Sequence, residues 1–208
     1  MSMSWPSLET LCAHAPIPPG VTLRAWTPEE QAALPALLRA WYPSAAVGAE
    51  SVFLEPAFLG ARVFVADGDF FVFAICQEGE VVGFQAFERQ RPARTLHGRL
   101  AVLAPAARAG FLGALGFPLF EALGELTGAE LLLTWVTLST KIQQLMAERR
   151  GFTLCGLVPA VEVALGPDGR PVRVMEALYA KARVSGVWPD DALLTPNTRR
   201  VLAQLHRP

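Results

Sequence analysis

The spacing of apolar residues along the chain switches between two periods, and these switches predict the order of helices and strands. Leucines recur every three or four residues around 34–41 and over 111–126, which predicts two helices. A third helix is expected over 140–150, with Ile142, Leu145 and Met146 on one face. Runs of aromatic and β-branched residues predict strands at 21–26, 70–77, 81–88, 96–103, 131–136, 152–165 and 172–181.

Short polar motifs predict where some of these elements begin and turn. In Thr27-Pro28-Glu29-Glu30 the threonine can cap a helix, and Glu30 completes a capping box. Pro35 is expected to kink or split that helix. Glu78-Gly79-Glu80 joins two strands as a hairpin, and 166–169 is a turn by composition. The segment 44–62 reads as one short helix and loops.

The order of elements predicts an α+β fold with one mixed, mostly antiparallel central sheet and helices on both faces. Strands 96–103 and 131–136 flank a helix of crossover length, so we expect them to be parallel neighbours. Pro16, Pro18, Pro19 and Gly20 predict that residues 1–20 form a surface arm. The domain then covers 21–182, and 183–208 form a C-terminal extension with one helix, which begins around Thr195.

Composition and charge exclude several classes of protein. The chain has 208 residues, of which 52% are hydrophobic and 18% charged, and this excludes an intrinsically disordered chain. The chain has no uncharged apolar stretch long enough to predict a membrane span. The net charge of −1 shows no electrostatic footprint for nucleic acid. A mean hydropathy of +0.32 predicts an additional buried surface, such as a homodimer interface.

The cysteines predict neither a disulfide framework nor a metal site. Cys12, Cys76 and Cys155 are odd in number and far apart, and no pair of histidines lies near them. Cys76 and Cys155 are expected to be small buried apolar groups. The first basic residue is Arg24, so no signal peptide is predicted. We therefore expect a protein of the reducing cytoplasm that holds no metal.

The stretch that begins at Leu103 carries the most informative chemistry. A strand ends in Leu103-Ala104-Pro105, and Arg108, Gly110 and Gly113 follow at a predicted helix start. A loop of this kind directs free backbone N–H groups and the positive end of the helix dipole at one place, where a phosphate can bind. A tight turn and close helix packing explain the same glycines, because Gly110, Gly113 and Gly116 recur every three residues.

The order and spacing of these motifs resemble the acetyl-CoA-binding core of the GNAT superfamily of N-acyltransferases. That family's strand, V-x-P and R-x-x-G-x-G/A pattern aligns with Leu103, Pro105, Arg108 and Gly113. The family's E-K-x-G-F ending is matched by Glu148-Arg149-Arg150-Gly151-Phe152. The hairpin with residues 81–84 resembles the family's second and third strands, and residues 176–181 resemble its last strand. The resemblance covers about residues 21–181 and implies the GNAT-like acyltransferase fold.

The resemblance implies acetyl-CoA as acyl donor and assigns its binding site. Backbone N–H near Leu103 would polarise the thioester carbonyl, and Thr140 stands where the family usually has Asn. The pyrophosphate would lie on the loop formed by Arg108, Ala109, Gly110, Phe111, Leu112, Gly113 and Ala114. Two residues depart from the pattern: Phe111 replaces a glycine, and Ala147 stands where many members carry a tyrosine that protonates the departing thiolate.

The catalytic base is expected on the strands before the loop. Counting back from Pro105, His97 takes a position where the family often has a carboxylate, and an imidazole with a pKa near 6.5 suits removal of a proton from an ammonium through water. Glu88 is the second candidate. Both residues also have ordinary structural explanations: His97 can pack on its strand and bond to a neighbour, and Glu88 can be a solvated carboxylate. Four arginines lie near this hairpin: Arg89, Arg91, Arg94 and Arg99. A solvated turn is the favoured explanation for them, and recognition of an acidic acceptor is the alternative.

Three functions remain open from the sequence. The first is an N-acetyltransferase that moves an acetyl group from acetyl-CoA to a primary amine of a small-molecule or peptide acceptor by direct attack. The second is a non-catalytic GNAT-fold module that binds acyl-CoA or regulates, which Phe111 and Ala147 favour. The third is an unrelated α+β domain with a structural glycine loop. The family resemblance implies that the acceptor pocket is built by the first helix, the segment 44–62 and the last hairpin.

Overall fold

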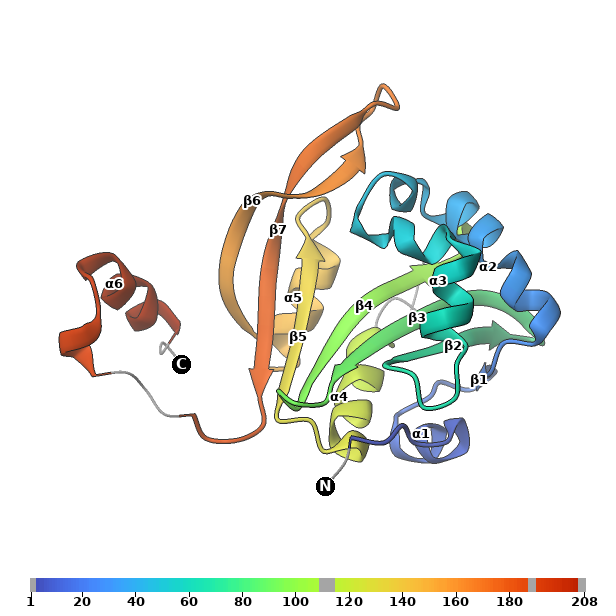
Figure 1. The fold of residues 1–208 in the computed structure, drawn as a ribbon, viewed down its shortest axis with the longest axis horizontal. Coiled ribbons are helices and arrows are strands. Elements are labelled where there is room, and N and C mark those ends of the chain that lie inside the picture. Colours follow the sequence, from blue (N-terminus) through green and yellow to red (C-terminus); the bar gives the residue numbers. More distant parts are fainter. Residues whose placement is uncertain (1–2, 109–114, 187–189, 206–208) are drawn as a thin grey trace.

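A seven-stranded sheet forms the centre of the molecule (Figure 1). The computed structural model describes residues 3–108, 115–186 and 190–205. The strands lie in the order β1-β2-β3-β4-β5-β7-β6, and all neighbours are antiparallel except β4 and β5. Their bounds are β1 Val21–Arg24, β2 Phe70–Gln77, β3 Glu80–Gln90, β4 Thr95–Leu103, β5 Leu131–Thr137, β6 Thr153–Leu165 and β7 Pro171–Ala182. The predicted mixed, mostly antiparallel sheet is confirmed.

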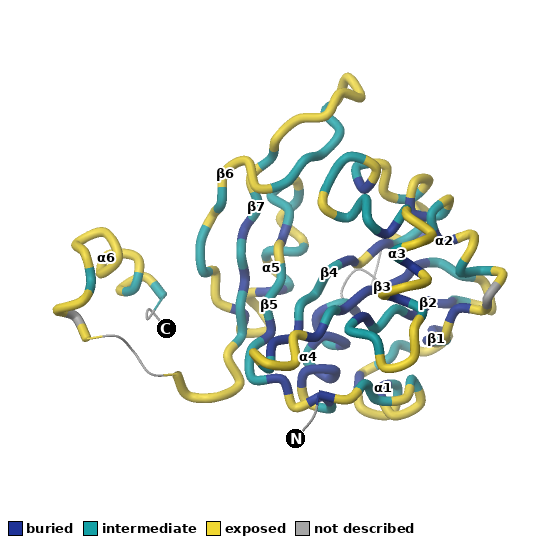
Figure 2. Tube along the Cα trace, viewed as in Figure 1, coloured by how far each residue is buried: buried dark blue, intermediate teal, exposed yellow. Residues whose placement is uncertain are grey.

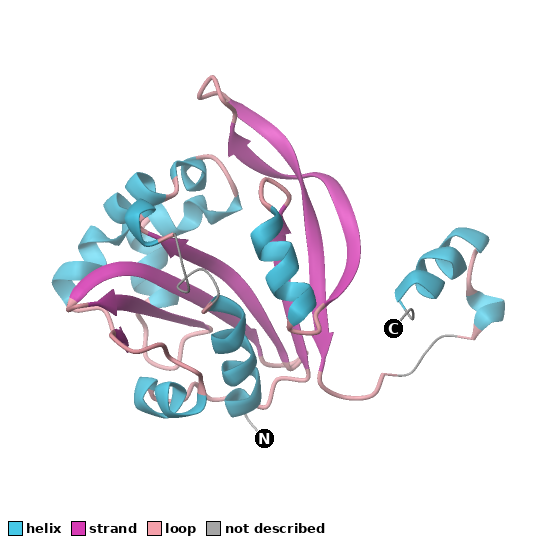
Figure 3. Cartoon of the chain, turned by 180° about the vertical axis from the view of Figure 1, so that it is seen from behind, coloured by secondary structure: helices cyan, strands magenta, loops and turns pink. Residues whose placement is uncertain are grey.

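Helices cover both faces of this sheet, as predicted. One face carries α2 (Pro28–Trp41), α3 (Pro56–Phe58) and the short turns between and after them, η1 (Pro43–Ala46), η2 (Ala49–Leu54) and η3 (Leu59–Val63). The other face carries α1 (Leu8–His14), α4 (Gly116–Thr127) and α5 (Lys141–Arg149). Of these, α4 and α5 stand in front of the strands in the reverse view of Figure 3. A separate apolar core lies on each face.

The local signals for the first helix and the first hairpin are confirmed. Thr27 caps α2, with its hydroxyl accepting from the Glu30 N–H at 3.4 Å and the Glu30 carboxylate accepting from the Thr27 N–H at 3.0 Å. The hairpin turn places Glu78 at φ 53° and Gly79 at φ 88°, as a two-residue turn of primed type requires. The expected split at Pro35 is wrong, because α2 runs through this residue as one helix.

The parallel pair at the centre of the sheet is confirmed, but it is short. Thr95–Gly98 of β4 pair with Leu131–Thr134 of β5, and beyond these residues the two strands separate. In the ladder with β3, Ala86 pairs with Leu100 and Phe87 with Gly98, which leaves Arg99 as an extra residue on β4. A β-bulge of this kind bends the strand and increases its twist. The bulge therefore lies where β4 and β5 part.

The N-terminal segment differs from the expected surface arm. Residues 8–14 form α1, and Leu11 on this helix is fully buried in the core of the α4 face. Met3 is 2% exposed, and Trp5 stacks on Phe71 with ring centroids 5.2 Å apart. Arg89, expected in a solvated turn, is 1% exposed and holds this segment, because its guanidinium donates to the Met3 carbonyl.

Three further segments differ from the prediction in detail. The segment 44–62 forms several short helical turns instead of one helix. The described part of the helix predicted over 111–126 begins at Gly116, and the residues 109–114 lie outside the described chain. On α5 the apolar face is buried only in part: Met146 packs against the core, whereas Ile142 is 61% exposed and Leu145 45% exposed. Instead Ala147 is the residue of α5 that is fully buried.

The outer strands and the C-terminal part are far more exposed than the middle of the sheet. Figure 2 shows buried chain along β2, β3 and β4, whereas β6 and the helix α6 (Pro196–Leu205) are exposed or half-buried. Cys76 is buried, as predicted, but Cys155 is only half-buried on β6, and each described cysteine is a free thiol. None of the helices in the described ranges is long and apolar enough to cross a membrane.

Candidate functional site

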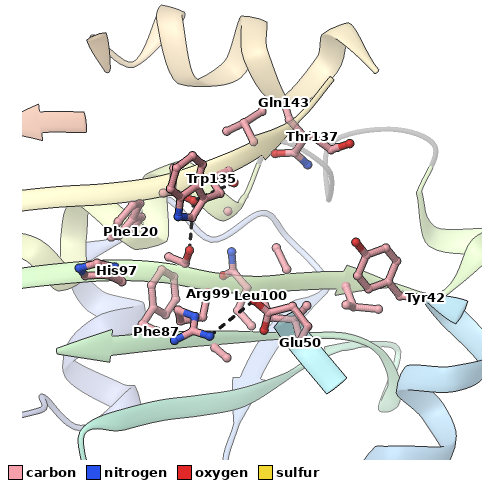
Figure 4. A pocket seen from close by; sticks show the side chains of 18 of the residues that line it. Tyr42, Glu50, Phe87, His97, Arg99, Leu100, Phe120, Trp135, Thr137 and Gln143 are labelled. Atoms are coloured by element: carbon pink, nitrogen blue, oxygen red, sulfur yellow. Dashed lines mark hydrogen bonds and ion pairs between the residues drawn. The ribbon is translucent and has the colours of Figure 1, made fainter. Parts of the chain in front are cut away.

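A cavity of about 600 Å³ opens where β4 and β5 separate (Figure 4). On the side of α4 it is lined by Gly116, Phe117 and Phe120 together with Gln85 and Phe87 of β3. On the side of α2 it is lined by the end of α2, by η2 and by the β6–β7 hairpin, with Tyr42, Glu50, Val161, Glu162 and Glu176. The cavity thus passes between the strands and reaches both faces of the sheet.

The two predicted bases, His97 and Glu88, lie beside each other at this cavity. They are direct cross-strand partners on β4 and β3, and both line the cavity. Burial lowers the pKa of the half-buried His97, and the Glu88 carboxylate raises it in part. His97 is therefore a neutral imidazole at neutral pH. The Glu88 carboxylate forms an ion pair with the Arg99 guanidinium.

The bulge residue Arg99 lies between two carboxylates on the α2 side. Its guanidinium pairs with Glu88 and lies 3.7 Å from an oxygen of Glu50, and it stands over the Phe70 ring at 5.9 Å. The Arg99 side chain is only 27% exposed. The expectation of a solvated turn is therefore wrong for Arg99 as it is for Arg89. Figure 4 shows Arg99 and Glu50 facing each other below β4.

Glu50 is the site residue that the sequence did not reveal. It lies in η2, its side chain is 17% exposed, and its Oε2 has no hydrogen-bond partner in the described part of the chain. Burial raises the pKa of Glu50 to about 7, against the opposing effect of the Arg99 charge. Repulsion from Glu162, Glu176 and Glu88 adds to the rise. A carboxyl group with this pKa can take and release protons near neutral pH.

Two more carboxylates come from the last hairpin. β6 carries an irregularity between Val158 and Glu162, where Ala160 adopts φ 55°, and this turns Glu162 toward η2. The Glu162 Oε1 accepts from the N–H groups of Ala49 at 2.9 Å and Val163 at 2.6 Å. Burial raises the pKa of Glu176, and the neighbouring Glu162 charge raises it further. The Glu176 and Glu162 carboxylates thus lie close to each other across the hairpin.

Aromatic side chains complete the walls. Trp135 of β5 lines the cavity with 41% of its surface exposed, and Tyr42, at the end of α2, is 37% exposed. Burial and, after it, the charges of Glu176, Glu162 and Glu50 raise the pKa of the Tyr42 hydroxyl. In Figure 4 the Trp135 ring projects from β5 toward the β4 side of the cavity. Such exposed aromatic rings offer apolar contact and a partner for cations.

Gln85 is an unsatisfied polar group on the α4 side. It is 4% exposed, it lines the cavity, and its Oε1 has no hydrogen-bond partner among the described residues. Its Nε2 lies so close to Gly116 that a Cβ on this glycine would come within 2.8 Å of it. Buried polar atoms in proteins are nearly always hydrogen-bonded. The free oxygen therefore indicates that the cavity is shaped for a ligand that offers a donor.

The predicted donor-binding residues are only partly described by the structure. Arg108 lines the cavity, but its guanidinium donates to the Leu103 carbonyl at 3.1 Å and to the Trp41 carbonyl, so it connects β4 with the end of α2. Ala109, Gly110, Phe111, Leu112, Gly113 and Ala114 lie outside the described residues. Among the described residues, Leu115, which precedes α4, forms no side-chain cap.

Thr140 and Ala147 have structural roles in the described chain. The Thr140 hydroxyl accepts from the Ile142 N–H at 3.2 Å and caps α5. Ala147 is fully buried in the core between α5 and the sheet, so its side chain does not reach the cavity. No group of three metal-ligating side chains occurs within 3–108, 115–186 and 190–205.

The sequence has no match among protein-family models or curated proteins. Solved structures match it in fold. A protein from Chromobacterium violaceum described as a probable acetyltransferase of the GNAT family shares 16% identity at a TM-score of 0.57, covering 86% of this chain and 94% of that one. YncA from Salmonella typhimurium, whose structure holds its cofactor acetyl-CoA, shares 17% identity at a TM-score of 0.56. The match covers 83% of this chain and 99% of that one.

A third structure, RimJ from Mycobacterium smegmatis in complex with CoA-disulfide, shares 16% identity at a TM-score of 0.59 and covers 88% of each chain. The chain thus has the fold of the GNAT acetyltransferases over most of its length. The family resemblance in the motifs and the sheet topology agree. The fold therefore agrees with the first two of the three functions that the sequence left open.

Proposed function

We propose that this protein is an acetyl-CoA-dependent N-acetyltransferase that acts on a primary amine. The observation that carries the proposal is the cavity at the separation of β4 and β5, because it joins a donor side and an acceptor side through the sheet. On the α4 side it offers backbone groups and apolar surface. On the α2 side it offers carboxylates that can receive an ammonium and its proton.

The donor side fits acetyl-CoA through backbone groups. From Arg99 to Leu103, β4 has no pairing to β5, so this edge is open to the amides of the pantetheine arm. The start of α4 and the loop from Arg108 to Ala114 would receive the pyrophosphate. A backbone N–H near Leu103 would polarise the thioester carbonyl. The orphan oxygen of Gln85 provides a further acceptor on this side.

Glu50 is the base that this geometry favours. A free amine is the nucleophile, so the ammonium must first lose a proton, and a carboxylate with a pKa of about 7 is suited to take it. His97 remains a second base, acting through water, because its imidazole is neutral near pH 7. Glu88 is paired with Arg99, and this favours a role in positioning the guanidinium. The departing CoA thiolate is a good leaving group and needs little help from an acid. The reaction can therefore proceed although Ala147 stands where many family members have a tyrosine as the acid.

The competing function is a GNAT-fold module that binds acyl-CoA without catalysis. Phe111 at a glycine position and Ala147 at a tyrosine position favour it. The presence of an amine-facing carboxylate with a raised pKa favours the enzyme. A module of this kind has no need of a titrating group at the acceptor side.

A thiol-release assay over a panel of primary amines tests the proposal. We expect acetyl-CoA to raise the Tm, because a ligand of the folded state stabilises it. We also expect amine-dependent release of the CoA thiol and an acetylated product of the mass of the amine plus one acetyl group. Stabilisation by acetyl-CoA without release for any amine would instead establish the non-catalytic module.

The proposal includes a homodimer in the cytoplasm. β6 is an edge strand, and large apolar side chains are exposed on the hairpin that it forms with β7: Leu154 39%, Leu157 52%, Val161 38%, Val172 42% and Met175 42%. A second copy pairing along this edge would bury them and account for the high mean hydropathy. Light scattering of the purified chain, compared with Leu157→Glu, measures the oligomeric state.

A further inference from the structure

The acceptor side of the cavity carries more negative charge than one ammonium group requires. We propose that the acceptor is a small aliphatic diamine or polyamine, whose reacting amine lies at Glu50 and whose second cationic group lies between Glu162 and Glu176. This inference rests on the proposed acetyl transfer and specifies its substrate class. Each part of it comes from a separate feature of the cavity.

The first feature is a charge imbalance. Four glutamates line the cavity: Glu50, Glu88, Glu162 and Glu176. Both arginines among the described lining residues are engaged, Arg99 chiefly with Glu88 and Arg108 with two backbone carbonyls. The like charges of Glu50, Glu162 and Glu176 therefore repel each other in the free protein, and a bound cation relieves that repulsion.

The second feature is a set of polar oxygens without partners. Oε2 of Glu50 is buried and has no hydrogen-bond partner in the described chain. Gln85, which is 4% exposed, presents a second such oxygen to the same cavity from the donor side. Burying polar atoms without partners is unfavourable, so both sides of the cavity are built to meet N–H donors. An ammonium brings three donors to the Glu50 side.

The third feature is the aromatic lining. Trp135 and Tyr42 are both more than a third exposed, although each lines the cavity beside the carboxylates. An aromatic face next to carboxylates binds the methylene chain and the cationic head of an alkylammonium together. A polyamine has this alternation of methylenes and charges. An acidic or neutral acceptor would face desolvated carboxylates here without compensation.

The fourth feature limits the size of the acceptor. Two contacts connect the η1–η2 segment with β6: the Ala49 N–H donates to Glu162 at 2.9 Å, and the Leu165 N–H donates to the Ser44 hydroxyl at 3.1 Å. A Cβ at Gly48 would lie 2.5 Å from the Glu162 carboxylate, so the two segments touch closely. These contacts bridge the acceptor side between α2 and the hairpin. They favour a small molecule over the terminus of a folded protein.

The reaction balances with these residues. The reacting ammonium gives one proton to the Glu50 carboxylate, and its nitrogen then attacks the thioester carbon. The C–N bond forms as the C–S bond breaks, and the second nitrogen proton passes to the departing sulfur. Glu50 then releases its proton to solvent, so the products are the N-acetyl amine, the CoA thiol and one proton.

Matched acceptors test the second cationic site. We compare 1,4-diaminobutane and spermidine with 4-amino-1-butanol, which replaces the second ammonium by a neutral hydroxyl, and with 4-aminobutanoate, which replaces it by a negative charge. We expect kcat/KM for the diamine to exceed that of the amino alcohol at least tenfold, since hydrogen bonds to a charged group stabilise by about 1.5–3 kcal/mol. Salt should raise the KM of the diamine more than that of the amino alcohol.

A variant pair assigns the preference to the hairpin. Glu176→Gln removes one charge and is preferred over a change at Glu162, because the Glu162 carboxylate also accepts hydrogen bonds from the N–H groups of Ala49 and Val163. We expect E176Q to lower the ratio of kcat/KM for 1,4-diaminobutane over 4-amino-1-butanol toward one. Glu9→Gln on α1, at the opposite face of the sheet, removes the same charge and should leave the ratio unchanged.

The possible results separate this inference from the proposed function. Equal kcat/KM for the diamine and the amino alcohol, or an unchanged ratio in E176Q, would overturn the second cationic site while acetyl transfer stands. Acetylation of basic peptides in preference to every small amine would overturn the small-molecule acceptor. If no amine releases CoA although acetyl-CoA binds, the proposed function itself is wrong, and the inference falls with it.

Discussion

The donor side and the acceptor side of the cavity are built from different groups. On the donor side the ligand meets the open edge of β4, the first turn of α4 and apolar rings such as Phe117 and Phe120. On the acceptor side it meets charged side chains from η2, β6 and β7. Backbone groups bind the common part of any acyl-CoA, whereas carboxylates discriminate between acceptors by charge. In the proposed function, the choice of donor therefore follows from the backbone of the fold, and the choice of acceptor from a few side chains.

The two sides also differ in how far the chain travels to build them. Apart from Gln85 and Phe87 of the neighbouring β3, the donor side is built by β4, α4 and β5, which follow one another within residues 95–137 as one crossover. The acceptor side gathers Tyr42, Glu50, Arg99, Glu162 and Glu176 from four separate stretches. Changes on the acceptor side should therefore alter catalysis and acceptor choice without preventing acetyl-CoA from binding.

Replacing Glu50 should produce the largest effect. Glu50→Gln keeps the size of the side chain and removes the base, so we expect kcat/KM for 1,4-diaminobutane to fall about 10²- to 10⁴-fold. The shift in Tm that acetyl-CoA produces should persist, because the donor side is intact. A loss of both together would contradict the separation of the two sides. Glu9→Gln serves as the matched control for the lost charge.

The pH dependence of wild-type kcat/KM identifies the base. Burial raises the pKa of Glu50 to about 7, so its carboxylate form, the active base, disappears as the pH falls through 7. We expect the ratio of wild-type to E50Q activity to fall about tenfold per pH unit below 7 and to level off above. Deprotonation of the amine itself affects both proteins and cancels in this ratio. A ratio that stays flat, together with a break in the wild-type profile well under 6.5, would assign the base to His97 instead, because burial lowers the pKa of His97 and this residue is present in both proteins.

The groups that face Glu50 define the conditions of that test. Arg99 lowers the pKa of Glu50, whereas Glu162, Glu176 and Glu88 raise it, and Tyr42 stays protonated across this range because its own pKa is raised. Glu176→Gln should therefore move the break to lower pH. A break that does not move in E176Q would contradict the coupling between the carboxylates.

The same carboxyl should reduce the stability of the free protein at high pH. Its pKa rises on folding from an ordinary 4.5 to about 7, so the folded state binds its proton more tightly than the unfolded state. The stabilisation that this proton gives is complete below pH 4.5 and is lost as the pH rises through 7. At pH 8.5 we expect Glu50→Gln to increase the free energy of unfolding by up to about 3 kcal/mol. Urea titrations at pH 5 and 8.5 measure the difference, which should shrink at the lower pH.

Gln85→Leu examines the donor side in the same way. It replaces a buried amide whose Oε1 has no partner in the described chain by an apolar group of similar size, so we expect the free protein to gain about 1 kcal/mol. Acetyl-CoA should bind more weakly if the amide oxygen accepts from the bound donor. Calorimetric titration checks the affinity, and thermal unfolding without ligand checks the stability. Unchanged affinity would remove Gln85 from the donor side.

The smallest effect is expected from the bridge over the acceptor side. Ser44→Ala removes the hydroxyl that accepts from the Leu165 N–H on β6. We expect a loss of about 1 kcal/mol in stability and a higher KM for spermidine at unchanged acetyl-CoA affinity. Comparison with Ser51→Ala, also on the helical turns of the α2 side, separates the effect of the bridge from that of a lost serine.

Sequence reasoning succeeded where neighbouring residues decide the structure. The capping box at Thr27 and Glu30 and the turn at Glu78 and Gly79 involve contacts within three residues, so they are visible in the sequence. It failed where distant parts of the chain override a local signal. Arg89 is polar and follows a strand, yet it is buried because the N-terminal segment covers it. Ile142 and Leu145 have helical spacing, yet both are exposed, and Ala147 is the residue of α5 that is fully buried.

The sequence by itself determined the order of the elements, the parallel crossover at the centre of the sheet and the resemblance that points to acetyl-CoA, because hydrophobic period, caps and glycine spacing are local properties. It also pointed to the first helix, the segment 44–62 and the last hairpin, and residues from the end of α2, from η2 and from the β6–β7 hairpin line the cavity. Only the tertiary structure decided which side chains meet there. Glu50 lies in a segment without a strong periodic pattern, and its raised pKa arises from burial and from carboxylates more than a hundred residues away in the chain. Such proximity depends on the β-bulges and twist of strands that are paired over long sequence distances, and no local pattern encodes it.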